Sequence, residues 1–399
     1  MNISILFFIA IGLVAALLNS TAPTPLYPLY QQEFNLTSVN MTMIYGAYAG
    51  GVIISLISVG NFTKKVSDLR YVIILSLFLV LLGAAVFAFA DSSLWLFIAR
   101  VISGVGTGAL TGAANVSLVR YGPNDSGKIA ALIATLSFTI GLALGPIISS
   151  LSLQLDFYPT VFPFLFIMVF SIVSMLGICF SWSKENDKDQ RSHKVENEDN
   201  DRKEGMSNLI LYTKRKFFII SVSLFICWSI AASVFSLGPF IAKSLLGVND
   251  SGIFGYVMAI YLIISGFSQI VSRKMSPERS LFYGVVTIVG SIAILFASIA
   301  LQSLFLACVG LIIAGYSYGA IFVGCATLIN IISPQDRHAK IVSRFYLIAY
   351  VANWVPIFLG VLVDRISLLF AVNLLFITSF LVCVIVGWYI KRTPFYLAN

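Results

Sequence analysis

Residues 94–150 read LWLFIARVISGVGTGALTGAANVSLVRYGPNDSGKIAALIATLSFTIGLALGPIISS and contain two apolar segments separated by a short polar turn. In each segment the small and polar residues recur at a helical spacing and therefore share one helix face, within roughly a 100° arc in the first segment. These residues are Arg100, Gly104, Thr107, Gly108, Thr111 and Asn115 in the first segment, and Ala130, Ala134, Ser137, Gly141 and Gly145, followed by Pro146, in the second. Small residues on one face of an apolar helix allow another backbone to approach closely, as in packed membrane helices.

The composition of the whole chain is that of a membrane protein. Of its 399 residues, 59% are hydrophobic and 11% are charged, and the mean hydropathy is +0.95. A soluble domain would be about 25% charged, and a helix needs roughly 20 apolar residues to cross the hydrocarbon. We predict an all-α membrane protein with twelve transmembrane helices near residues 3–31, 38–61, 70–90, 94–119, 127–151, 158–182, 217–242, 252–272, 281–300, 303–332, 341–363 and 368–390.

The distribution of basic residues predicts how the chain is oriented. All but four of the 25 Lys and Arg residues lie in loops after even-numbered spans, in the central polar segment or at the C-terminus. The four exceptions are Arg100, Lys243, Arg344 and Arg365. Because cytoplasmic loops carry the excess of positive charge, both termini are predicted to be cytoplasmic. The net charge of +8 therefore reflects membrane topology and does not indicate a nucleic-acid partner.

A long polar segment divides the spans into two sets of six. Residues 183–216 mix both signs of charge without apolar periodicity, which predicts a flexible cytoplasmic linker. The expected domains are an N-terminal six-helix bundle over 1–182 and a C-terminal six-helix bundle over 217–399.

The two sets of spans are similar to each other. Similar polar motifs follow spans four and ten, and their prolines, Pro123 and Pro334, are 211 residues apart. Span ten also carries Gly315, Gly319 and Gly324, a pattern like that of the glycines in span four. A parallel duplication of a six-helix bundle explains both observations, and it predicts a pseudo-twofold axis with the substrate site at the interface near the bilayer midplane.

Two motifs give the chain a resemblance to the major facilitator superfamily over its full length. The run from Arg100 to Gly108 resembles the fourth-helix motif of that family, an arginine followed by spaced glycines. The run from Gly141 to Pro146 resembles the fifth-helix motif of antiporters, which are mostly exporters, although Ser149 and Ser150 replace two further glycines. The resemblance to the twelve-helix drug or metabolite:proton antiporters implies two bundles that alternately open a central site.

A third family motif, in the loop after span two, is degenerate. The family pattern is Gly-x-x-x-Asp-Arg-x-Gly-Arg, whereas this chain starts at Gly60, has Lys64 in place of the acid and Ser67 in place of the second glycine, and carries Asp68 at a normally basic position. The resemblance therefore leaves open whether this loop forms a latch, in which Asp68 would pair with Arg120 or Arg344.

The candidate site residues are polar or aromatic residues within the spans. A charge inside an apolar run needs a partner or a water-filled cavity. Arg100 therefore either binds an anionic substrate or, as the resemblance implies, holds carbonyl groups of span one. Span one itself contains Pro23, Pro25 and Pro28, which predict a bend. The proposed pathway residues are Asn19, Tyr45, Tyr48, Arg100, Asn115, Trp228, Tyr316, Asn353 and Trp354, with Tyr318 as a further aromatic candidate; the proposed conformational motif residues are Gly60, Asp68, Gly104, Gly108, Gly141, Gly145 and Pro146.

The acidic residues limit the choice of proton site. All 17 acids lie outside the predicted spans or at their edges, and the candidates for proton coupling are Glu33 and Asp364. We find no nucleotide-binding motif, no metal-spaced His/Cys cluster and no nucleophile–base pair, so we expect no enzyme activity, cofactor or metal.

Aromatic pathway candidates with few polar groups favour lipophilic ligands. The expected function is proton-coupled efflux of lipophilic or drug-like small molecules by a monomer in the bilayer of a bacterial inner (plasma) membrane. The alternatives are a sugar or metabolite permease of the same superfamily and, in another class, a transport-inactive membrane sensor or lipid-handling protein.

Overall fold

The computed structural model describes residues 3–62, 68–123, 128–182, 206–248, 250–333 and 338–392. In this part of the chain all regular secondary structure is helical, and twelve helical spans are long and apolar enough to cross a membrane, as predicted. Helices are the expected solution because hydrocarbon offers no hydrogen-bond partner to the backbone, so each span must satisfy its own amide groups.

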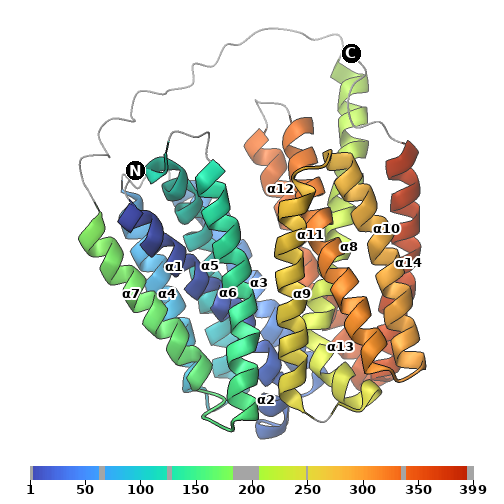
Figure 1. The fold of residues 1–399 in the computed structure, drawn as a ribbon, viewed down its shortest axis with the longest axis horizontal. Coiled ribbons are helices and arrows are strands. Elements are labelled where there is room, and N and C mark those ends of the chain that lie inside the picture. Colours follow the sequence, from blue (N-terminus) through green and yellow to red (C-terminus); the bar gives the residue numbers. More distant parts are fainter. Residues whose placement is uncertain are drawn as a thin grey trace.

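The first six spans pack side by side and form the N-terminal half of the molecule (Figure 1). They consist of α1 (Ile3–Thr21), η1 (Thr24–Leu26) and α2 (Tyr27–Glu33), which together make span one, and of α3 (Ser38–Phe62), α4 (Leu69–Ala88), α5 (Ser93–Tyr121), α6 (Lys128–Gln154) and α7 (Phe162–Ser181). The other six form the C-terminal half: α8 (Met206–Leu246), α9 (Ser251–Ser272), α10 (Pro277–Ala300), α11 (Leu304–Ile332), α12 (His338–Val351) with η4 (Ala352–Trp354) and α13 (Val355–Arg365), and α14 (Leu368–Arg392).

Each half has its own hydrophobic core. One core consists of buried residues between Ile5 and Trp182, and another of buried residues between Ile219 and Ile390. Residues 183–205 of the expected linker lie outside the described residues, and α8 already begins at Met206, so the last part of the expected linker is helical. We propose that the boundaries predicted from composition separate two bundles, with the second bundle extended by this first part of α8.

The repeat is visible in the helix that carries the glycine motif. Helix α11 begins and ends 211 residues after α5, the offset that the two prolines predict. A Cβ atom on Gly104 or Gly108 of α5 would meet residues of α3, and a Cβ on Gly315 would lie 2.6 Å from the Tyr261 carbonyl oxygen of α9. Gly319 faces α9 in the same way. The same small-residue face therefore packs the corresponding helix pair in both halves.

Two spans are broken. Span one loses its α-helix between Thr21 and Tyr27, where Pro23 and Pro25 remove backbone donors, as the prolines predict. Span eleven breaks at Ala352–Trp354, just before Pro356, a break that was not predicted.

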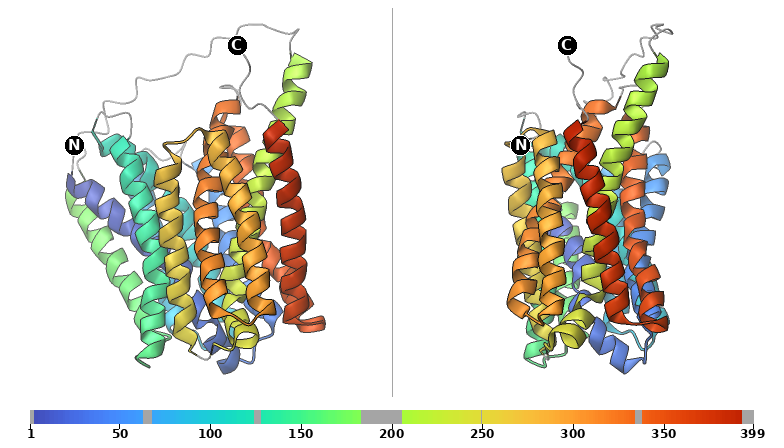
Figure 2. Two further views of the ribbon diagram at one scale, coloured as in Figure 1. Left: turned by 45° about the vertical axis from the view of Figure 1, so that its right-hand side comes forward. Right: turned by 90° about the vertical axis from the view of Figure 1, so that its right-hand side faces the viewer.

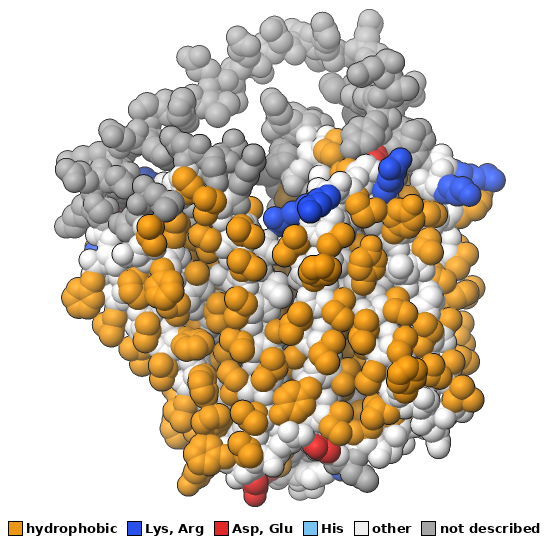
Figure 3. Space-filling view, in the orientation of Figure 1, with side chains coloured by type: hydrophobic (Ala, Val, Ile, Leu, Met, Phe, Trp, Pro, Cys, Tyr) orange, Lys and Arg blue, Asp and Glu red, His pale blue; other side chains and the backbone are white. Residues whose placement is uncertain are grey.

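The surface agrees with a bilayer location. We call the end of the molecule where α1 begins and α14 ends the termini face, and the other end the opposite face (Figure 2). Figure 3 shows a broad belt of hydrophobic side chains, with Lys and Arg side chains at the termini face and acidic side chains at the opposite face. The chain is thus a multi-pass membrane protein whose charged residues lie at the two edges of the apolar belt.

Candidate functional site

The break in span one creates backbone acceptors, and Arg100 satisfies one of them. The α-helix ends at Thr21, and Arg100 Nη1 donates a hydrogen bond of 2.8 Å to the Ser20 carbonyl oxygen. Arg100 Nη2 donates to the Tyr27 hydroxyl on the far side of the break. Arg100 therefore joins α5 to both helical parts of span one.

Aromatic rings surround the same guanidinium. Its Cζ atom lies 5.7 Å, 5.6 Å and 5.7 Å from the ring centroids of Tyr27, Tyr48 and Phe87. Cation–π contacts at this range stabilise a desolvated charge. Within the described part of the chain no carboxylate forms an ion pair with Arg100, and its side chain is only 1% exposed. Of the two roles predicted for Arg100, this geometry favours holding span one over contacting a substrate.

Asn19 serves the packing of the N-terminal half. Its side-chain amide donates to the Val80 carbonyl oxygen at 3.2 Å and to Ser103 Oγ at 2.9 Å, and the residue is fully buried. It therefore links α1 with α4 and α5. This placement differs from the predicted position on the pathway.

An aromatic group lies where the two halves meet. Trp228 of α8 packs against Tyr350 of α12 with ring centroids 5.2 Å apart, and Tyr261 of α9 packs against Tyr318 of α11 at 6.0 Å. From the other half, α3 packs against α8, α12 and η4, and the Gly46 carbonyl oxygen of α3 accepts a hydrogen bond from the Trp354 indole there. Tyr45 and Tyr48 lie on either side of Gly46 in the sequence of α3. We call Tyr45, Tyr48, Trp228, Tyr261, Tyr318 and Tyr350 the central aromatic group.

The central aromatic group offers hydrogen-bonding groups without an ionised side chain. The Trp228 indole N–H is buried and has no acceptor among the described residues. A buried donor without a partner costs free energy, about 1–3 kcal/mol, and a bound molecule with an acceptor would recover it. The group combines flat apolar surfaces with phenol and indole donors, a chemistry that suits uncharged aromatic or lipophilic molecules.

The residues predicted from the sequence differ from the members of this group in three tyrosines. Tyr316 was expected on the pathway, but successive positions on a helix are about 100° apart, so Tyr316 and Tyr318 cannot share a face. The Tyr316 carbonyl instead accepts a hydrogen bond from Ser268 Oγ at 2.7 Å. Tyr261 and Tyr350 were missed. For Tyr350 a signal existed, because it lies three and four residues before the candidates Asn353 and Trp354.

Three further pathway candidates are not members of the aromatic group, although two of them contact residues in or next to it. Asn115 is exposed on α5. The Asn353 amide donates to the Tyr350 carbonyl oxygen at 3.1 Å and so supports the break in span eleven. The Trp354 indole donates to the Gly46 carbonyl oxygen at 3.2 Å, which joins η4 to α3 across the two halves.

The two halves are hydrogen-bonded to each other at the opposite face. The Asp364 carboxylate at the end of α13 accepts hydrogen bonds from the backbone N–H groups of Ser38, at 2.9 Å, and Val39, at 3.0 Å, which are the first residues of α3. A second contact between the halves joins the last residue of α6 to the residue that precedes α9, where Gln154 Nε2 donates to Asp250 Oδ2 at 2.8 Å. Towards the termini face, the ribbons of the two halves diverge (Figure 1). The described conformation is closed at the opposite face.

The two candidates for proton coupling have different surroundings. Glu33 is exposed at the end of α2. Asp364 is also exposed, but it caps a helix of the other half, where a carboxylate interacts favourably with the positive end of the helix dipole. Asp364 is therefore the candidate whose charge is tied to the relative position of the two halves.

The fifth-span motif lies between α1 and α9. A Cβ atom on Gly141 would lie 2.7 Å from the Val14 carbonyl oxygen, and a Cβ on Gly145 would lie 2.8 Å from the Leu18 carbonyl oxygen. The carbonyl group of Pro146 lies on the other side, next to Gly255 of α9. Ser149, which replaces a glycine of the family motif, donates to the Ala22 carbonyl oxygen at 2.7 Å. This substitution supplies a hydrogen bond to the broken part of span one.

The degenerate motif after span two is only partly described. Gly60 lies near the end of α3, and residues 63–67, including Lys64 and Ser67, lie outside the described residues. Asp68 caps α4, where its carboxylate accepts a hydrogen bond of 2.8 Å from the Arg70 backbone N–H. This contact gives Asp68 a local structural role.

Comparisons with known proteins agree with this architecture. A sequence profile described as the Major Facilitator Superfamily matches residues 9–355. The chain belongs to the major facilitator superfamily. The superfamily consists of membrane carriers, so the chain is a transporter that binds small-molecule substrates. No curated protein matches the chain in sequence.

Solved structures of other superfamily transporters share the fold. The chain is similar to a POT family transporter in complex with a thioalcohol-conjugated peptide, with a TM-score of 0.78 and 13% identity over 98% of this chain and 96% of that chain. It is also similar to a D-xylose–proton symporter, with a TM-score of 0.77 and 13% identity over 99% and 100%. A bacterial homologue of the human lysosomal transporter Spinster, inward-facing and occupied, gives a TM-score of 0.73 at 13% identity over 99% and 98%. At this identity the likeness concerns the fold alone.

Proposed function

We propose that this superfamily transporter exports uncharged, lipophilic small molecules, and that the central aromatic group binds them. The observation that supports the proposal is the composition of that group, which takes residues from both halves and has no ionised member. The guanidinium of Arg100, 5.6 Å from the Tyr48 ring centroid, already donates to the Ser20 carbonyl and the Tyr27 hydroxyl. A bound molecule would contact Tyr45 and Tyr48 from one half and Trp228, Tyr318 and Tyr350 from the other. Rocking of the halves would then expose it to one face or the other in turn.

The direction of transport is proposed from the fifth-span motif. Gly141, Gly145 and Pro146 resemble the motif of antiporters that are mostly exporters, and α6 packs against both α1 and α9. Close backbone contact on both sides of α6 allows it to shift with little rearrangement of side chains. These features support export from the face that carries the termini.

Flux measurements in liposomes containing the purified protein test the substrate class. Lipophilic fluorescent dyes and sugars are offered separately, and dye transport without sugar transport is expected. Trp228→Phe keeps a ring but removes the indole donor, and it should lower dye transport about tenfold, the effect of losing one to two kcal/mol of binding. Trp388→Phe is the matched control, because Trp388 lies on α14 and is 49% exposed. Sugar transport without dye transport would overturn the proposal in favour of a permease, and binding without any flux would favour a sensor.

Proton coupling is proposed through Asp364, with Glu33 as the second candidate. A charged carboxylate holds the N-terminus of α3 more strongly than a neutral one, so protonation of Asp364 would loosen the opposite face. An imposed pH gradient should drive dye transport by the wild-type protein, and the double variant Glu33→Gln/Asp364→Asn should lose this dependence. Dye flux in the double variant that still responds to the gradient contradicts the assignment.

A further inference from the structure

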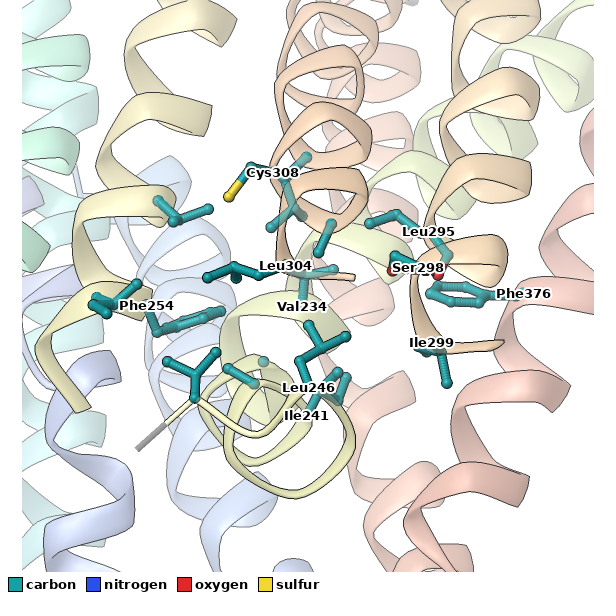
Figure 4. A pocket seen from close by; sticks show the side chains of 17 residues that line it. Val234, Ile241, Leu246, Phe254, Leu295, Ser298, Ile299, Leu304, Cys308 and Phe376 are labelled. Atoms are coloured by element: carbon teal, nitrogen blue, oxygen red, sulfur yellow. Dashed lines mark hydrogen bonds between the residues drawn. The ribbon is translucent and has the colours of Figure 1, made fainter. Parts of the chain in front are cut away.

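A cavity lies inside the C-terminal half near the opposite face. It is bounded by α8, α9, α10, α11 and α14, and its volume is about 60 Å³. Figure 4 shows the side chains of Phe254, Leu304, Leu295 and Phe376 around it. This cavity is separate from the central aromatic group, none of whose residues lines it.

The wall of the cavity offers nothing to a polar ligand. Of its 17 lining residues in the described chain, Ser298 alone carries a hydroxyl group, and Ser298 Oγ already donates to the Leu295 carbonyl oxygen at 2.7 Å. Water in a cavity needs two to four polar partners, and apolar cavities accept apolar guests instead. The occupant must therefore be hydrocarbon.

The internal repeat explains why a cavity exists at this place. At the offset of 211 residues, Tyr27, Tyr30 and Arg100 of the N-terminal half correspond to Gly238, Ile241 and Leu311, which all line the cavity. Phe87 corresponds to Ser298 at this offset. If α4 and α10 are aligned by their last residues instead, Phe87 corresponds to Ile299. Ser298 and Ile299 both line the cavity.

The side chains on the N-terminal side of this correspondence are very large. Arg100, Tyr27, Tyr30 and Phe87 are among the largest fully buried side chains of the molecule, and they fill their half. Phe87 also stacks on Phe164 at 4.9 Å. Smaller residues at the corresponding positions leave the same region of the C-terminal half unfilled by protein.

One end of the cavity lies at the ends of two helices. Leu246 and Leu304, at the last position of α8 and the first position of α11, lie among its lining residues. Beside them, Leu301 and Phe305 are 69% and 75% exposed. Lys243 is exposed on the last turn of α8, and a lysine at the membrane edge attracts the phosphate of a lipid.

We propose that this cavity binds an acyl chain of a membrane phospholipid, whose headgroup lies at the opposite face near Lys243. The chain takes the place that the aromatic side chains occupy in the N-terminal half. The bound chain gains dispersion contacts with a wall that otherwise has no partner atoms, and Lys243 attracts the negatively charged headgroup.

Photolabelling of the full-length protein tests the proposal. The purified protein is reconstituted with phosphatidylglycerol that carries a diazirine in one acyl chain, irradiated and digested, and the labelled residues are identified by mass spectrometry. Labels should concentrate on the lining residues Leu304, Ala307, Cys308 and Leu311 of α11 and on the lining face of α8. Ala307→Phe fills the cavity and should lower this labelling severalfold, because the ring takes the space that the acyl chain would occupy. Ile312→Phe, on the same helix but 42% exposed and outside the cavity, should leave the labelling unchanged.

A second variant and the wild-type pattern keep the result interpretable. Leu311→Phe fills the cavity from another position, and both filled variants must retain the wild-type helical circular dichroism. Wild-type labels spread evenly over exposed side chains such as Phe305 and Ile312 would overturn the proposal, and so would cavity labelling that neither filled variant reduces. The assay requires no transport, so its outcome does not depend on the proposed substrate.

Discussion

The two halves of this transporter have the same arrangement of helices, but different side chains fill their interiors near the opposite face. In the N-terminal half, a buried arginine and three aromatic residues fill the space beside the break in span one. In the C-terminal half, the corresponding residues are small or aliphatic, and a cavity remains. A duplicated fold thus keeps the glycines that set the helix spacing, while the large side chains between the helices diverge. The difference shows which positions carry the architecture and which were free to change.

The largest effect should come from making the N-terminal half like the C-terminal half at Arg100. Arg100→Leu copies Leu311, removes the donors to Ser20 and Tyr27, and leaves the span-one carbonyl unsatisfied. We expect a loss of about 3 kcal/mol in the free energy of unfolding, from two hydrogen bonds to a charged group, and a loss of most transport.

Thermal unfolding in detergent and dye flux in liposomes measure these two effects. Arg100→Lys should fail almost as fully, because an ammonium group cannot span both acceptors as the planar guanidinium does. Wild-type flux of the lysine variant would mean that only a positive charge is needed at this position.

The next largest effect is expected at the glycines of α6. The corresponding helix of the C-terminal half is span eleven, and it is not continuous at this place because it breaks at Ala352–Trp354. Gly145→Leu would push α6 away from α1, since even a Cβ would meet the Leu18 carbonyl oxygen at 2.8 Å. Transport should fall more than tenfold at matched expression, and Gly141→Leu should behave alike. Gly112→Leu is the control, because a Cβ there meets nothing within 4 Å. Equal flux in all three variants would reject the close α1–α6 contact as a requirement.

The sequence predicted the course of the backbone better than the positions of the side chains. The twelve spans, the repeat offset and the glycine faces follow from hydropathy and spacing, which reflect constraints that every transmembrane helix obeys. The bend of span one was also predictable, because its prolines act locally. The break of span eleven was missed, although Pro356 is a local signal of the same kind.

The candidate site was harder to predict because membrane helices expose polar groups to several different neighbours. Asn19 and Arg100 are polar residues in a span, yet both turn to backbone acceptors within their own half. The central aromatic group takes its members from α3, α8, α9, α11 and α12, so only the tertiary arrangement brings them to the region where the two halves meet. Helical periodicity could have excluded Tyr316 once Tyr318 was chosen.

The smallest effect is expected at Asp364, where the two halves meet. Asp364→Asn keeps an acceptor but removes the charge, so the opposite face should open about fivefold more often, the factor given by a capping contribution of about 1 kcal/mol. Spin labels introduced at Asn40→Cys and Arg365→Cys measure the distance across this contact by electron resonance. An unchanged distance distribution would show that the cap does not set the balance between the two conformations.

The cap that Asp364 places on α3 also couples the carrier to the medium around it. The carboxylate and the helix end are both exposed, so their attraction decays over a Debye length of about 8 Å at physiological ionic strength and less in concentrated salt. Buried hydrogen bonds such as those of Arg100 lack this sensitivity. We therefore expect the fraction of molecules that is open at the opposite face to rise with the ionic strength at that face.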